Sequence, residues 1–165
     1  MNTAPGDDGL TLSGEMVLSY PFEPAIDPLM NGVRLAIYRS FPNGAVLEDA
    51  IIPSGAYDTV TKKGWKVNGP GTTWTYVNTP NDLPSKINKV QVKVDTHNLG
   101  LVKFSAKGKA GAFGVALGQI PVTMEFSLES GAALNGQCAV ERFPGPFRVN
   151  PLCFFNAPVS TLNCR

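Results

Sequence analysis

The sequence contains little of what usually identifies an enzyme or a membrane protein. Its 165 residues include one histidine and three cysteines. It has no run of about 20 apolar residues, which predicts that no helix spans a membrane. Its 17 glycines and 14 prolines are spread along the chain and leave no room for long helices. The polar N-terminus is not typical of a signal peptide, although a secreted chain whose leader has been removed looks the same.

The residues from which catalytic sites are built are also sparse. His97 lies in a predicted turn with Asp95 and Ser105 nearby in sequence, but no Gly-x-Ser-x-Gly motif accompanies it. The acidic residues of the second half are predicted on outward strand faces rather than as a pair across a cleft. These are Glu125, Glu129 and Glu141. The sequence therefore predicts a protein that is not an enzyme, and a hydrolase that uses His97 is the weakest alternative.

Metal and phosphate sites have no matching motif either. Cys153, Cys164 and His97 lack the spacing of zinc ligands. Asp7, Asp8 and Asp27 lie near turns and have the chemistry of calcium ligands, but no EF-hand loop is present. The glycine-rich segment GKAGAFG at residues 108–114 is not a phosphate-binding loop. We expect no metal and no cofactor.

What the chain does contain is a repeated alternation of apolar and polar residues, which predicts β-strands. The clearest case is residues 121–129, and about eleven such strands are expected. Residues 46–52 alternate imperfectly, which indicates a bulge. Residues 20–32 hold three prolines and are predicted to form neither a strand nor a helix. The predicted fold class is all-β, with antiparallel strands arranged in one or two β-sandwiches.

Two segments of the chain resemble each other. GWKVNGPGTTWTY at residues 64–76 aligns with CFFNAPVSTLNC at residues 153–164, so that Asn68 falls on Asn156 and Thr73 on Thr161. The match extends to residues 33–38, which fall on residues 122–127. This predicts an internal duplication with pseudo-symmetry. We expect a tail at residues 1–8, a first β unit at 9–78, a linker at 79–86 and a second unit at 87–165, which could pack as one domain.

The aligned segments predict two hairpins with the same register. Paired residue numbers in an antiparallel hairpin have a constant sum, so the register that pairs Trp65 with Tyr76 also pairs Cys153 with Cys164. We expect Trp65, Trp74 and Tyr76 to form a structural aromatic clasp, with stacking on sugars as the alternative.

The cysteines favour one disulfide. A Cys153–Cys164 bond would add about 2–3 kcal/mol and would indicate an extracellular or cell-surface protein. The alternative is three reduced cysteines. If the disulfide forms, Cys138 is left as a buried thiol or as a link to another chain.

Charge is distributed unevenly along the chain. Residues 1–60 carry eight acidic and two basic side chains, whereas residues 61–109 carry nine lysines and two aspartates. These regions could pair internally or with another copy, or could simply be solvated. Four lysines are predicted to share one face of two strands: Lys89, Lys93, Lys103 and Lys107. This face could bind an anionic polysaccharide, but nucleic acid is not expected because Phe104 points away from it.

Two further features bear on partners. The second unit has a strand at residues 87–95 before its start at Gly100-Leu101, whereas the first unit has only the tail at residues 1–8 before its start at Gly9-Leu10. This predicts an open sheet edge that a neighbouring copy could fill. Tyr38, Phe41 and Tyr57 are the candidate contacts for a sugar ligand.

The following motifs together resemble uncharacterised β-rich repeat segments of predicted secreted bacterial proteins: Ile51-Ile52-Pro53-x-Gly55-Ala56-Tyr57-Asp58, Gly64-Trp65-Lys66-Val67-Asn68, Trp74-x-Tyr76 and Lys103-x-x-Ala106-Lys107-Gly108. The likeness covers most of residues 30–143. That group has no assigned activity, so the resemblance implies an extracellular β module and no site residue. We therefore predict a non-enzymatic structural or adhesion module that self-assembles into an array or filament. A carbohydrate-binding module is the alternative.

Overall fold

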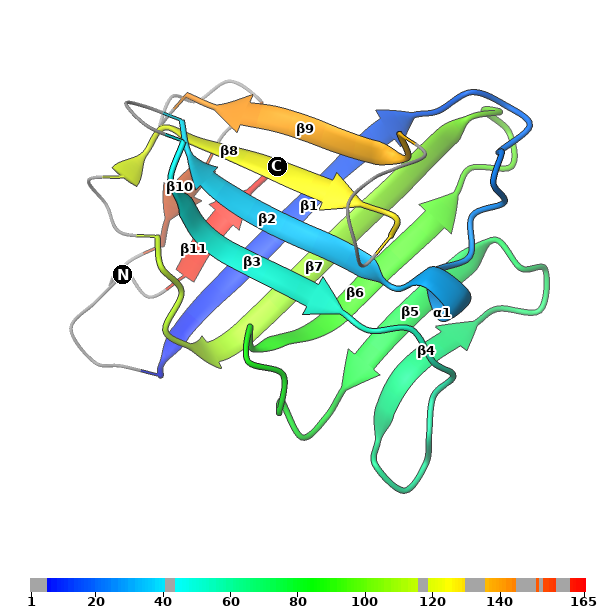
Figure 1. The fold of residues 1–165 in the computed structure, drawn as a ribbon, viewed down its shortest axis with the longest axis horizontal. Coiled ribbons are helices and arrows are strands. Elements are labelled where there is room, and N and C mark those ends of the chain that lie inside the picture. Colours follow the sequence, from blue (N-terminus) through cyan, green and yellow to red (C-terminus); the bar gives the residue numbers. More distant parts are fainter. Residues whose placement is uncertain are drawn as a thin grey trace.

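The computed structural model describes residues 6–40, 44–115, 119–129, 136–144, 151, 153–156 and 161–165. The fold of these residues is all-β, with two sheets and one short helix (Figure 1). The larger sheet has seven strands. In spatial order they are β10 (Cys153–Phe155), β11 (Thr161–Cys164), β1 (Asp8–Val17), β7 (Leu101–Gly111), β6 (Ile87–Val94), β5 (Thr73–Asn78) and β4 (Lys63–Val67).

One pair of strands in the larger sheet departs from the expected antiparallel arrangement. β11 runs parallel to β1, with Leu10 opposite Leu162 and Leu12 opposite Cys164, while the other neighbours are antiparallel. The prediction of purely antiparallel sheets is therefore wrong at this pair. A tight turn forces consecutive strands to run antiparallel, but β1 and β11 come from opposite ends of the chain and no turn joins them.

The smaller sheet has four antiparallel strands in the order β3 (Val46–Ile52), β2 (Val33–Arg39), β8 (Val122–Ser127) and β9 (Cys138–Phe143). Ile37 pairs with Glu48 and Tyr38 with Val46, so Leu47 is an extra residue in β3. The bulge predicted in residues 46–52 is confirmed.

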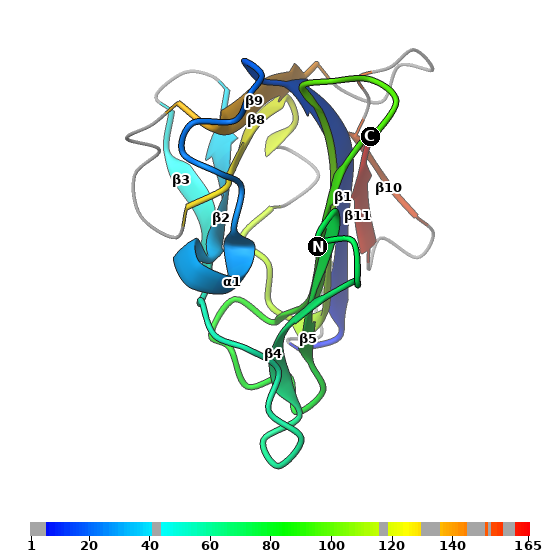
Figure 2. The ribbon, with the colours of Figure 1, turned by 90° about the vertical axis from the view of Figure 1, so that its right-hand side faces the viewer.

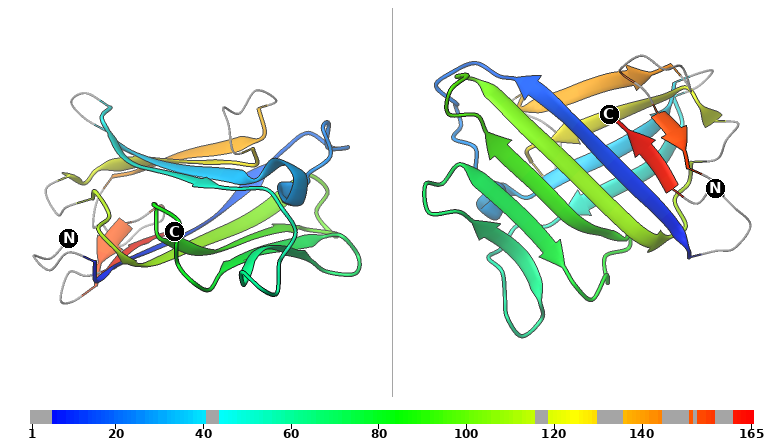
Figure 3. Two further views of the ribbon diagram at one scale, coloured as in Figure 1. Left: turned by 60° about the horizontal axis from the view of Figure 1, so that its bottom comes forward. Right: turned by 180° about the vertical axis from the view of Figure 1, so that it is seen from behind.

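The two sheets lie face to face, as Figure 2 and the left panel of Figure 3 show. Their inward side chains form one buried cluster to which both sheets contribute. Within this cluster Phe104 of β7 stacks on Phe126 of β8, with ring centroids 4.2 Å apart and planes 6° apart. The Phe104 ring also covers Gly14 of β1, where an added Cβ would lie 2.7 Å from it. A glycine at this position therefore lets an aromatic ring bridge the sheets.

Strands from the two halves of the chain alternate in the larger sheet, whereas in the smaller sheet the two halves meet at one strand pair. The pairs β1–β7 and β2–β8 each join a strand of the first half to a strand of the second. In the larger sheet β1 and β7 are neighbours. The next strand beyond β7 is β6, which separates it from β5, whereas the next strand beyond β1 is β11, with no strand between them. The predicted open edge beside β1 is therefore wrong, because β7 and β11 already bond both sides of this strand.

The proline-rich segment 20–32 contains the helix α1 (Pro28–Asn31), so the prediction that this segment has no helix is wrong for these four residues. The carboxylate of Asp27 accepts hydrogen bonds from the backbone N–H groups of Leu29 and Met30. Pro28 occupies the first turn, where its missing N–H is not needed. No described helix is long and apolar enough to cross a membrane.

Candidate functional site

The aromatic residues of the β4–β5 hairpin lie in the core. Trp65 pairs with Tyr76 and Val67 with Trp74, in the predicted register. Trp65 and Tyr76 are each 1% exposed, and their ring centroids lie 5.4 Å apart. The Trp65 indole N–H donates a hydrogen bond of 2.8 Å to the Pro53 carbonyl. Because the rings of Trp65 and Tyr76 face inward, these two residues offer no surface on which a sugar could stack.

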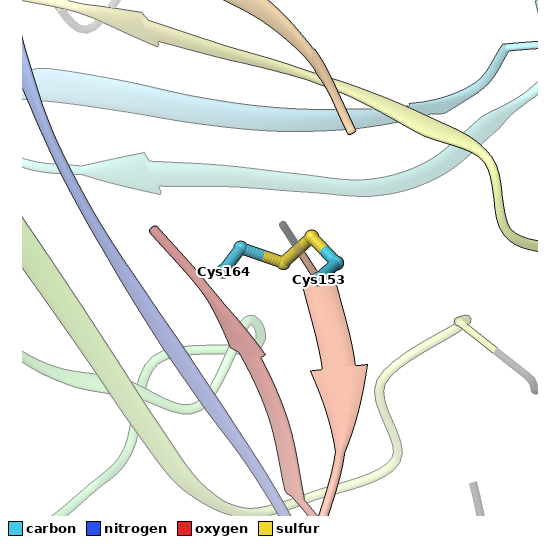
Figure 4. Close-up of a disulfide and its surroundings, with 2 residues drawn as sticks. All are labelled: Cys153 and Cys164. Atoms are coloured by element: carbon cyan, nitrogen blue, oxygen red, sulfur yellow. A yellow bond between two sulfur atoms is a disulfide. The ribbon is translucent and has the colours of Figure 1, made fainter. Parts of the chain in front are cut away.

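The predicted disulfide is confirmed. Cys153 and Cys164 face each other across β10 and β11 and are bonded, with Cα atoms 4.2 Å apart (Figure 4). Cys138 is a free, half-buried thiol on β9. Burial and, to a smaller extent, the charge of Glu125 raise the pKa of Cys138, so its reactive thiolate form is disfavoured.

The three candidate sugar contacts do not form one platform. Tyr38 is half-buried on β2, and its hydroxyl donates to Glu125 at 3.3 Å. Tyr57 lies in the loop beside β4 of the other sheet, and Lys66 Nζ lies 3.8 Å from the centroid of its ring. Phe41 lies outside the described residues.

The turn that carries His97 is organised by Asp95. One carboxylate oxygen of Asp95 accepts the backbone N–H groups of His97 (2.9 Å) and Asn98 (3.0 Å). These hydrogen bonds lower the pKa of Asp95. The His97 imidazole is in contact with Thr96 at 3.4 Å rather than with Asp95. Over the described ranges, no group of three or more His, Cys, Asp or Glu residues could hold a metal ion.

Four lysines gather on the outer face of the larger sheet, which is turned toward the viewer in the right panel of Figure 3. Lys89 lies directly opposite Lys107, and Lys93 lies opposite Lys103. All four are exposed, while Phe104 between them points into the core. We refer to Lys89, Lys93, Lys103 and Lys107 as the lysine face.

Neutral hydrogen-bonding groups separate the two lysine pairs. Gln91 lies opposite Ser105 on one side and Thr75 on the other, and its amide donates to the Thr75 hydroxyl at 3.4 Å. Hydroxyl and amide groups thus lie level with the midpoint between the cations. On the outer face of β6 and β7, Gln91 and Ser105 are the described residues between the lysine pairs.

The two lysine pairs differ in their acidic neighbours. Lys103 Nζ lies 3.3 Å from Glu15 and 3.8 Å from Asp95. No acidic side chain of the described residues forms an ion pair with Lys89, Lys93 or Lys107. A depression of about 450 Å³ opens at the Lys89–Lys107 end and is also lined by Thr11, Asn88, Lys109 and others. This end therefore combines uncompensated positive charge with space for a ligand.

A second hollow was not predicted from the sequence. It has a volume of about 460 Å³ and lies where the segment after β1 crosses the ends of β5 and β6; Tyr20, Phe22, Trp74, Asp95, Thr96 and Leu99 are among its lining residues. Tyr20 is 57% exposed, and its ring meets Phe22 edge-on at 5.4 Å. The signal in the sequence was the pair of aromatic residues Tyr20 and Phe22 in the proline-rich segment.

No family model, no curated protein and no solved structure matches this chain. Its function is therefore inferred from its own geometry.

Proposed function

We propose that this chain is a non-enzymatic, extracellular structural or adhesion module, folded as a β-sandwich from two copies of one unit. The observation that carries the proposal is the disulfide-closed hairpin β10–β11, which pairs with β1 and so ties the C-terminal strands to the N-terminal strand. Disulfides persist mainly in oxidising compartments, which supports a place outside the cytoplasm. A fold fixed at both ends suits a module that bears load or holds a surface in place.

The turns of the two hairpins support the duplication. The Asn68 backbone N–H donates to the Thr73 carbonyl, and the Asn68 side-chain oxygen accepts the Thr73 N–H at 2.9 Å. Asn156 makes the same two hydrogen bonds with Thr161, the second at 2.7 Å. These are the residues that the sequence alignment equates. A shared sequence and a shared local bonding pattern support an origin of the two segments as copies.

The edge strands support self-association. β3 and β9 border the smaller sheet, and β4 and β10 border the larger one. Edge strands present unpaired backbone groups that a second copy can bond. On β3 the apolar side chains of Val46 and Ile51 are exposed, and on β9 so is Val140. We therefore propose β3 as the first candidate for contacts between copies, because it borders its sheet and carries two exposed apolar residues.

The test is light scattering and electron microscopy of the purified, oxidised chain over a range of concentrations. We expect mass to rise with concentration, and Ile51→Lys to reduce that rise. Val60→Lys is the matched control, because Val60 is 86% exposed in a turn rather than on an edge strand. A chain that stays monomeric throughout would contradict the assembly role. Three titratable thiols in protein taken from its native cell, instead of one, would contradict the extracellular location.

The hollow beside Tyr20 favours a carbohydrate-binding module as the second candidate. It combines an exposed aromatic ring with the polar groups Thr72, Asp95 and Thr96, which is the usual composition of a sugar site. Trp74 also lines it, so a bound sugar should change tryptophan fluorescence. Loss of that change in Tyr20→Ala would support the candidate, and no change with a panel of neutral sugars would remove it.

A further inference from the structure

We propose that the lysine face binds an anionic polysaccharide chain that lies along β6 and β7. This inference rests on the adhesion role proposed above and names the chemical class of its partner. The binding groups are the two cross-strand pairs, Lys89 with Lys107 and Lys93 with Lys103, together with the neutral side chains between them.

The arrangement of the lysines is unfavourable for folding alone. Like charges directly opposite each other on neighbouring strands destabilise a sheet, and this face holds two such pairs side by side. Of these four lysines, only Lys103 has acidic partners within ion-pair distance among the described residues. Anionic groups bound between the lysines would replace this repulsion with attraction. The lysine pairs, which destabilise the free chain, would then stabilise the complex.

The spacing favours a polymer over a small anion. The two lysines of each strand are four residues apart, which corresponds to about 13 Å along an extended strand. A single carboxylate or sulfate reaches one pair only. A linear chain with repeated acidic groups reaches both pairs, and its sugar hydroxyls then lie over Gln91, Ser105 and Thr75, which can donate and accept hydrogen bonds.

The outward side chains favour a polysaccharide over nucleic acid or a membrane. Single-stranded nucleic acid is usually held by aromatic stacking as well as by charge, and the outward residues of β6 and β7 include no aromatic side chain. Insertion into a lipid surface needs a projecting apolar side chain such as a tryptophan or leucine. The centre of this face instead presents an amide and two hydroxyls.

The two pairs should contribute unequally. Glu15 and Asp95 already compensate part of the charge of Lys103, whereas Lys89 and Lys107 border the depression of about 450 Å³ together with Lys109. Removing the Lys89–Lys107 pair should therefore weaken binding more than removing the Lys93–Lys103 pair. Glu15→Gln should strengthen binding, because it releases Lys103.

The test is titration calorimetry of the whole oxidised chain with dextran sulfate, polygalacturonate and neutral dextran. We expect binding to one or both anionic polymers and none to neutral dextran; the two anionic arms tell sulfate from carboxylate. Lys89→Gln with Lys107→Gln should lower the affinity about tenfold or more, since two charge contacts are lost. The control Lys62→Gln with Arg142→Gln removes the same charge elsewhere and should change affinity by less than about twofold.

Three results would overturn the inference: equal binding of neutral dextran, an equal loss in the control variant, or tighter binding of duplex DNA or of vesicles with anionic lipids. If the lysine variant loses its fold by circular dichroism, Glu15→Gln and the salt dependence of the wild-type chain decide instead. A gain of affinity in Glu15→Gln supports the inference, and no change in affinity between about 0.05 M and 0.5 M salt contradicts it. Self-association through β3 is measured without any polysaccharide, so failure of the lysine face and failure of the assembly role are separate outcomes.

Discussion

The hairpins β4–β5 and β10–β11 have the same turn but different closing pairs. In both, an asparagine at the start of the loop bonds the backbone of the threonine that begins the returning strand. The first hairpin is then closed by Trp65 and Tyr76, whose rings pack 5.4 Å apart in the core. The second is closed by the Cys153–Cys164 disulfide at the corresponding pair of positions. The backbone register of a hairpin can thus be maintained by burial of large rings or by a covalent bond.

The difference follows from the size of the two hairpins and from their places in the sheet. β4 and β5 have five and six residues, whereas β10 and β11 have three and four. A short hairpin has few cross-strand bonds to hold it, and a disulfide compensates by restricting the unfolded chain. β11 is also an interior strand that bonds β1. Loosening the second hairpin therefore exposes β1, whereas loosening the first exposes β5.

The largest effect is expected from Trp65→Ala. This change removes a fully buried ring and leaves the Pro53 carbonyl without its indole donor, so we expect a loss of about 3–5 kcal/mol in the free energy of unfolding, measured with urea. Val67→Ala on the same strand is the control, because Val67 is half exposed and should lose less than about 1 kcal/mol. Similar losses in the two variants would show that burial does not close the first hairpin.

The second effect concerns the disulfide. Cys153→Ser with Cys164→Ser should lower the free energy of unfolding by about 2–3 kcal/mol, because the unfolded chain gains freedom. A reductant should cause the same loss in the wild-type chain and none in the double variant. Cys138→Ser is the control for the loss of a cysteine outside the bond. If reduction destabilised the double variant as well, the assignment of this bond as the closing pair would be wrong.

These hairpins also show which parts of the fold are readable from sequence. Register within a hairpin is a local property, since a short turn fixes which residues pair, and so the Trp65–Tyr76 and Cys153–Cys164 pairs could be predicted. The lysine face was predictable for the same reason, because β6 and β7 are consecutive strands with clear alternation. The bulge at Leu47 was predictable because the alternation of apolar and polar residues in residues 46–52 is imperfect.

Contacts between segments that are distant in the sequence could not be predicted from it. The parallel pairing of β1 with β11 depends on where a hairpin docks across more than a hundred residues of chain, and no local pattern records it. The hollow beside Tyr20 likewise depends on the path of residues 20–27 over the ends of β5 and β6. The short helix α1 was missed because three prolines outweighed the capping signal of Asp27 followed by Pro28.

The third effect distinguishes the hairpins by pH. Burial, aided by the nearby charge of Asp82, raises the pKa of Tyr76 from 10.0 to about 12. The folded state favours the neutral phenol of Tyr76. Its contribution to the free energy of unfolding is therefore complete below pH 10 and is lost as pH rises toward 12. We expect stability to fall by up to about 1.4 kcal/mol per pH unit in that window. Tyr76→Phe should remove this fall, whereas Tyr20→Phe, at an exposed tyrosine, is the control. An unchanged pH profile in Tyr76→Phe would contradict the burial argument.

The smallest effect tests whether the two turns are equivalent. Asn68→Ala and Asn156→Ala should each lower the free energy of unfolding by about 1 kcal/mol, because each removes the side-chain acceptor of the threonine N–H. Asn68→Ala should cost somewhat more, because the Asn68 oxygen also accepts the Thr72 N–H at 2.8 Å. Asn68→Asp and Asn156→Asp keep the acceptor oxygen and serve as matched controls close to wild type. If Asn68→Ala were costly and Asn156→Ala neutral, the common bonding pattern would be a coincidence of geometry and the duplication would lose its structural support. Comparable costs, in hairpins whose closing pairs differ so much, would show that the turn is what the two hairpins share.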